Sequence, residues 1–115
     1  MDQRVLSVDE VTANYQQLDG KRITVKGMLA GCEHWPFVCR LDADDPRGNS
    51  LGFDSPDHIR RKLKGDGGRE IVIEATFDAF CLGPFEERRT EETATFRVCL
   101  DAATDLKEPR ILDIR

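Results

Sequence analysis

DGKRITVKGMLAG, residues 19–31, carries the clearest structural signal in this chain. After an Asp-Gly turn pair, Ile23 and Val25 alternate with polar residues, as a strand with one buried face requires. Gly27 then interrupts the pattern, and a glycine inside a strand commonly marks a bulge or a sharp bend. A long strand bent at glycine can pair with two different neighbours along its length, as in small closed barrels. We therefore expect this strand to organise the fold.

The composition indicates one globular domain spanning residues 1–115. Charged residues make up 34% of the chain and apolar residues 39%, and the net charge is −5. The charge is uneven, at −3 over residues 1–20, +3 over residues 21–64 and −5 over residues 65–115. Overall electrostatics disfavour a polyanionic partner, so a nucleic-acid surface would have to come from the middle of the chain.

An N-terminal helical segment is predicted for residues 6–19, with the helix running from Leu6 to Leu18. Ser7 is placed as its N-cap and Glu10 stands three residues later, which is the spacing of a capping box. Four residues then form one apolar stripe at helical spacing, namely Val8, Val11, Tyr15 and Leu18. A second, shorter helix opens at Ser55-Pro56-Asp57, is anchored by an apolar stripe of Ile59 and Leu63, and ends at Gly65. The basic outer face of this second helix is interpreted as a solvated surface.

Five strands are predicted from alternating apolar residues bounded by turn signals. They are residues 21–30, 37–42, 50–53, 69–82 and 94–102. Parity places Cys39 and Leu41 on the inner face of the second strand and Phe53 inside the third. The segment after the fifth strand, residues 104–115, is expected to be a C-terminal extension whose Ile111, Leu112 and Ile114 form a patch against the barrel.

Strand, strand, strand, helix, strand, strand is the element order of the oligonucleotide/oligosaccharide-binding (OB) fold, a partly open five-stranded Greek-key barrel. Residues 20–103 resemble that fold in strand order and spacing. A preceding helix that leads into NYQQLDGKRITVKG, residues 14–27, is similar to small uncharacterised members of the family. The resemblance implies a mainly β protein with two helices that binds nucleic acid, sugar or protein. An open two-layer α+β sheet built from the same elements is the alternative.

The cysteines allow a metal-site hypothesis beside a simpler interpretation. In the resembled fold the two loops that carry them lie at one end of the barrel, and five residues could converge there on zinc: Cys32, His34, Cys39, Cys81 and Cys99. Their spacing is not the paired C-x2-C arrangement of zinc ribbons and fingers. We therefore expect buried thiols, place a zinc site behind them, and place a disulfide last because a reducing cytosol opposes it. No cofactor is expected.

Catalytic machinery is not evident in the sequence. His34 and His58 are the only histidines, and neither has a partner at a spacing that predicts a catalytic dyad. No nucleophile elbow, phosphate-binding loop or H-E-x-x-H motif is present. The chain is therefore predicted not to be an enzyme.

Surface recognition remains as the expected function. The OB resemblance places a ligand face on the second and third strands and their flanking loops, with aromatic and cationic residues at His34, Trp35, Arg40, Phe85, Arg88 and Arg89. Acidic residues crowd the same rims, which weakens binding of a nucleic-acid strand. Two hypotheses stay open: an interaction module that docks a protein partner or a second copy of itself, and a weak single-stranded nucleic-acid binder. The lack of a signal peptide or an apolar span predicts a cytoplasmic protein with no membrane association.

Overall fold

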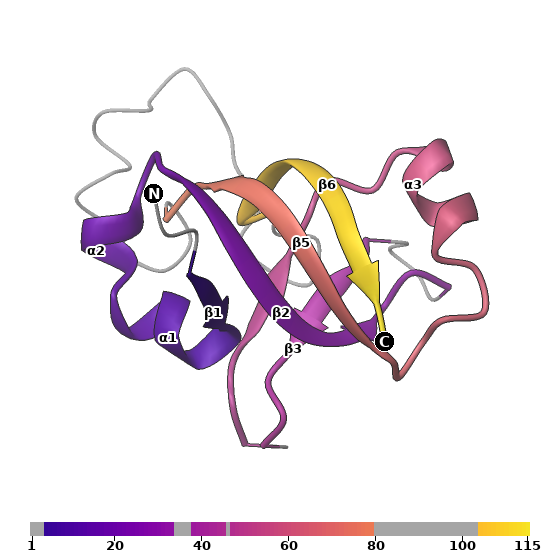
Figure 1. Cartoon of the computed structure of the whole chain (residues 1–115), viewed down its shortest axis with the longest axis horizontal. Helices are drawn as coiled ribbons and strands as arrows, with labels where there is room; N and C mark the ends of the chain where they lie inside the picture. Colours follow the sequence, from indigo (N-terminus) through magenta and orange to yellow (C-terminus); the bar gives the residue numbers. More distant parts are fainter. Residues whose placement is uncertain (1–3, 34–37, 46, 80–103) are drawn as a thin grey trace.

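The computed structural model describes residues 4–33, 38–45, 47–79 and 104–115, and within them the protein is mainly β with a few short helices (Figure 1). The strands are β1 (Val5–Ser7), β2 (Arg22–Ala30), β3 (Arg40–Asp42), β4 (Ser50–Gly52), β5 (Glu70–Phe77) and β6 (Leu106–Ile114). The helices are α1 (Val8–Ala13), α2 (Tyr15–Leu18) and α3 (Asp57–Lys62). Figure 1 shows α1 and α2 at one end of the sheet and α3 at the other.

β2 is the central strand of the sheet, whose order is β4-β3-β2-β5-β6 with β1 also paired to β2. One edge of β2 pairs in parallel with β1 at Thr24–Lys26 and then antiparallel with β3 at Met28–Ala30. Its other edge pairs with β5 without a break from Arg22 to Met28. The prediction that this strand has two neighbours along its length is therefore confirmed, and Gly27 lies at the change of partner.

Gly27 allows a close approach of backbones rather than a bulge. Its register with Ile71 of β5 is continuous with that of the flanking residues, so no extra residue is inserted. A Cβ atom at this position would lie 2.8 Å from Leu41 Cβ and 3.0 Å from Val8 Cγ2. The expected bulge is wrong, because the glycine is needed for space and not for a change in register.

The N-terminal segment differs from the single predicted helix. Leu6 belongs to strand β1, and the helical residues divide into α1 and α2 at Asn14. The Asn14 side-chain amide donates a hydrogen bond to the Glu10 carbonyl at 2.9 Å, and such local bonds compete with helix continuation. The capping box is confirmed, because Ser7 Oγ accepts from the Glu10 N–H and Glu10 Oε1 accepts from the Ser7 N–H, both at 3.1 Å.

The helix after β4 starts one residue later than predicted. Pro56 is the N-cap residue of α3, and Ser55 makes no cap hydrogen bond. Ser55 Oγ instead accepts from the Cys39 N–H at 2.9 Å and donates to the Phe53 carbonyl at 2.7 Å. The serine therefore ties β3 to the start of the helical segment.

The C-terminal segment is a strand of the sheet, not an extension laid against it. β6 pairs antiparallel with β5 over most of its length. The ladder skips Glu108 and Pro109, which together face one residue of β5, and Glu108 has a φ of 50°. A bulge accommodates a proline that cannot donate to the ladder. The strand was not predicted from the sequence because Pro109 follows Glu108 in its middle, and proline is disfavoured inside a strand.

The core lies between the curled sheet and the helices. The inward positions that parity predicted for Cys39, Leu41 and Phe53 are confirmed, because all three are fully buried. In β5, Ile71, Ile73, Ala75 and Phe77 are also fully buried. An isolated parallel bridge joins Phe53 to Leu106, so the chain beyond β4 touches the first residue of β6. Among the described strands the sheet is not closed into a barrel. The predicted strand at residues 94–102 lies outside the described residues.

Replacing Gly27 by alanine tests the close approach of β2 to its neighbours. The added Cβ meets Leu41, Val8 and the Asp42 carbonyl at 2.8–3.1 Å, and overpacking of this kind destabilises proteins by about 1–3 kcal/mol. We expect Gly27→Ala to lower the free energy of unfolding by that amount in urea titrations. Gly67→Ala is the control, because a Cβ there meets nothing within 4 Å. Equal stability of the two variants would contradict this account.

Candidate functional site

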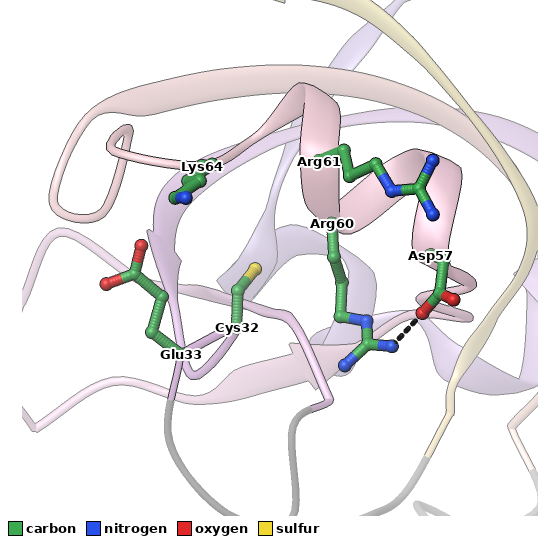
Figure 2. Close-up of a pocket in the computed structure, with 6 residues that line it drawn as sticks. All are labelled: Cys32, Glu33, Asp57, Arg60, Arg61 and Lys64. Atoms are coloured by element: carbon green, nitrogen blue, oxygen red, sulfur yellow. Dashed lines mark hydrogen bonds and ion pairs between the residues drawn. The ribbon is translucent and has the colours of Figure 1, made fainter.

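A pocket of about 420 Å³ lies between the connection that follows β2 and the helix α3. Figure 2 shows its lining residues, which are Cys32, Glu33, Asp57, Arg60, Arg61 and Lys64. Only Cys32 among them is uncharged. We refer to this cavity as the α3 pocket.

Packing of α3 against the core places its cations in the pocket. Ile59 and Leu63 are 7% and 1% exposed, so they form the buried side of this short helix. Residues next to them in sequence must then face outward or sideways. The predicted apolar stripe is thus confirmed, and the outer basic face lines a cavity in addition to meeting solvent.

The charges of the α3 pocket are only partly neutralised. Arg60 forms an ion pair with Asp57, while its Nε atom is buried without a hydrogen-bond acceptor. Glu33 Oε1 accepts a hydrogen bond from the Gly65 N–H at 3.4 Å. Within the part of the chain that the structure describes, the side chains of Arg61 and Lys64 make no hydrogen bond or ion pair. The charged residues that line the pocket therefore sum to +1, and its two cations without an ion pair among the described residues are Arg61 and Lys64.

A disulfide joins Cys32 to Cys39, so the expectation of buried thiols at these two positions is wrong. Their Cα atoms are 4.2 Å apart, slightly below the usual range of about 4.4–6.8 Å for cross-linked cysteines. The sequence argument ranked a disulfide last on the basis of an assumed compartment. The predicted turn between residues 30 and 37 already placed the two cysteines on either side of a chain reversal, but the ranking followed the compartment instead.

The zinc hypothesis loses two of its five ligands in this structure. Zinc binds cysteine as the thiolate, and the sulfurs of Cys32 and Cys39 are bonded to each other. His34, Cys81 and Cys99 lie outside the described residues. Over the ranges that the structure covers, no three His, Cys, Asp or Glu side chains are grouped as a metal site.

Of the residues predicted to form the ligand face, the structure describes only Arg40. Arg40 is a residue of β3, and its Nε atom contacts Asp42 Oδ1 at 2.8 Å. The same Asp42 oxygen accepts a hydrogen bond from Ser50 Oγ at 2.8 Å, which holds the pair in place. Arg40 is therefore engaged by a neighbouring carboxylate. The other predicted residues, His34, Trp35, Phe85, Arg88 and Arg89, lie outside the described part of the chain.

Sequence reasoning selected one residue of the α3 pocket, Cys32, as a possible zinc ligand, and it selected none of the others as part of a site. Arg60, Arg61 and Lys64 were recognised as a basic run, a signal that more often marks a solvated face. Cys32 and Glu33 are more than twenty residues away along the chain, and nothing local predicts that they lie beside α3.

Asp105 is a buried carboxylate at the junction of β4 and β6, away from the α3 pocket. It is 5% exposed, its Oδ2 accepts from the Gly52 N–H at 3.1 Å, and its own N–H donates to the Gly52 carbonyl at 2.9 Å. Burial raises the pKa of Asp105 to about 6, and the nearby Asp78 adds to the rise, while the hydrogen bond from Gly52 opposes it. The neutral carboxyl is therefore favoured only below about pH 6, a wider range than for an exposed aspartate.

Comparison of the chain with known protein families, curated proteins and solved structures finds no significant match. No helix in the described ranges is long and apolar enough to cross a bilayer. Function must therefore be argued from the geometry of this chain.

Replacing Asp105 by asparagine tests its buried charge. A pKa raised in the folded state means that folding takes up a proton, so this group stabilises the fold at low pH and loses that contribution as pH rises from about 4 through about 6. We expect the unfolding free energy of Asp105→Asn, relative to the natural protein, to increase by on the order of 1–2 kcal/mol between pH 5 and pH 8. Denaturant titrations at both pH values measure it, and a difference independent of pH would contradict the assignment.

Proposed function

We propose that this chain is a small, non-catalytic binding module of OB-like build, which docks a protein partner by receiving an acidic group in the α3 pocket. The proposal rests on which of its cations form ion pairs and which do not. Three arginines are each paired with an aspartate two or three residues away: Arg40 with Asp42, Arg60 with Asp57, and Arg69 with Asp66. Arg61 and Lys64, in the same pocket, form no ion pair with any residue that the structure describes.

Two uncompensated cations in a concave site suit a single acidic side chain. A nucleic-acid strand gains affinity by contacting successive phosphates, each with its own cation. Carboxylates already occupy the arginines that would extend such a track, and the net charge of −5 repels a polyanion. A protein segment with one or two carboxylates needs only the charges that are available, because charge-assisted hydrogen bonds to arginine are among the stronger polar contacts.

The OB-like build is supported by element order and by the contact between β4 and β6. Among the described elements from β2 onward the order is strand, strand, strand, helix, strand, strand, with β6 as the last of them. The Phe53–Leu106 bridge and the paired hydrogen bonds between Asp105 and Gly52 bring the two ends of the sheet together. We infer a partly open barrel, which is the form this fold takes.

Weak single-stranded nucleic-acid binding is the second candidate function. The middle of the chain, residues 21–64, carries a charge of +3, and the α3 pocket adjoins the loop whose sequence continues with His34 and Trp35. Single-strand binders commonly combine aromatic side chains that stack on bases with cations that bind phosphates.

The cytoplasmic location remains a prediction. A lasting Cys32–Cys39 disulfide is typical of an oxidising compartment, and in a reducing one the bond would be reversible.

Fluorescence anisotropy with two labelled probes tests the proposal and separates it from the second candidate. The probes are a short peptide rich in Asp and Glu and an oligothymidylate, each titrated at low salt. We expect the peptide to bind more tightly, and the double variant Arg61→Glu/Lys64→Glu to weaken its binding by about tenfold or more because two favourable charges are reversed.

The control is Lys21→Glu/Arg47→Glu, which makes the same change in net charge at two exposed cations outside the pocket. It should retain most of the peptide affinity. Equal losses of peptide affinity in both double variants would show that net charge alone causes the effect, and would contradict binding in the α3 pocket. Tighter binding of the oligothymidylate, lost only in the pocket variant, would establish the nucleic-acid alternative instead.

A further inference from the structure

The two sulfurs of the Cys32–Cys39 disulfide differ in their access to small molecules. Cys39 is 0% exposed and belongs to the core. Cys32 is partly exposed and lines the α3 pocket. A reagent that enters the pocket therefore meets the sulfur of Cys32 first.

Two cations, Lys64 and Arg60, and the carboxylate of Glu33 lie near that sulfur. Figure 2 shows the Cys32 sulfur turned toward the space between Lys64 and Arg60, with the Arg61 side chain running along α3 beyond Arg60. Arg60 is paired with Asp57, and Glu33 accepts from the Gly65 N–H, so the pocket's two carboxylates are already in contact with other groups. An attacking thiolate is an anion, and it is attracted by the positive charge that remains.

We propose that the α3 pocket is a site of thiol–disulfide exchange, at which a small thiol bearing carboxylate groups attacks the sulfur of Cys32. The thiolate forms a new S–S bond to Cys32 Sγ while the bond between Cys32 and Cys39 breaks. Cys39 leaves as a thiolate and takes up a proton from solvent. One disulfide is consumed and one is formed, so the step needs no oxidant or reductant beyond the attacking thiol.

The dimensions and charges of the pocket select this class of thiol. A cavity of about 420 Å³ falls in the range of small-molecule sites, which is enough for a compact thiol or a short peptide-like one. Arg61 and Lys64 lack side-chain partners among the described residues and can receive its carboxylates. A thiol without other charged groups is attracted only through its thiolate, and a thiol that also carries an ammonium group is attracted less.

The fold can lose this cross-link and keep its core. Only seven positions separate the two cysteines, and a short loop gains least from a cross-link because the unfolded chain is constrained least. Cys39 stays in place through backbone bonds, since its N–H donates to Ser55 Oγ at 2.9 Å and its carbonyl accepts from the Phe53 N–H at 3.0 Å. Exchange therefore changes the wall of the pocket and leaves β3 attached to β4.

This exchange activity uses the same pocket as the proposed docking function but does not require a protein partner. The two proposals can therefore fail separately. If the protein selects among thiols but does not bind the acidic peptide, only the docking function is contradicted. If it binds the peptide but does not select among thiols, only the exchange site is contradicted.

Rates of mixed-disulfide formation test the exchange site. The oxidised full-length protein is incubated with mercaptopropionate, mercaptoethanol or cysteamine, quenched with acid and digested, and the adduct is located by mass spectrometry. Each rate is divided by the rate of the same thiol with a small reference disulfide, which removes differences in intrinsic nucleophilicity. We expect the normalised rate for mercaptopropionate to exceed that for cysteamine by about tenfold, with the adduct on Cys32 and the preference reduced by salt.

The charge variants decide whether the pocket causes the preference. Arg61→Glu/Lys64→Glu should abolish or invert it, and Lys21→Glu/Arg47→Glu should retain it. Equal normalised rates for the three thiols in the natural protein, an adduct formed first on Cys39, or the same loss in both double variants would each overturn the proposal.

Discussion

The close contact of β2 with its neighbours at Gly27 is the constraint on which the rest of the structure depends. At this residue one edge of β2 passes from β1 to β3, and Leu41 and Val8 occupy the space that a side chain would take. The other edge continues along β5 in unbroken register. One strand thus joins the N-terminal segment, the β3–β4 pair and the β5–β6 pair in a single sheet.

That arrangement also determines where the α3 pocket forms. β2 ends at Ala30, just before Cys32, and β3 returns just after Cys39, so the disulfide closes the end of the turn between them. α3 is held against the core by Ile59 and Leu63, which directs its cations toward the same turn. Two segments that are separate in sequence therefore build one cavity with a sulfur in its wall and unneutralised positive charge beside it.

Ion pairs between residues close in sequence determine which cations of the protein are available to a ligand. Short-range Arg–Asp pairs neutralise the cations of β3, of the start of α3 and of the turn before β5. Exposed pairs of this kind contribute little to stability. They do reduce the positive potential that a polyanion would need, whereas Arg61 and Lys64 form no ion pair among the described residues.

The sequence by itself determined the elements whose signals are local: the Ser7–Glu10 capping box, the alternation in β2 and β5, the apolar stripe of α3, and the absence of a recognisable catalytic motif. Such features depend on hydrogen bonds and periodicity within a few residues. Only the tertiary structure decided that β6 completes the sheet across a proline bulge, that Cys32 is bonded to Cys39, and that Cys32 lies beside the cations of α3. These depend on contacts between segments that the folded backbone brings together, which no local pattern in the chain records.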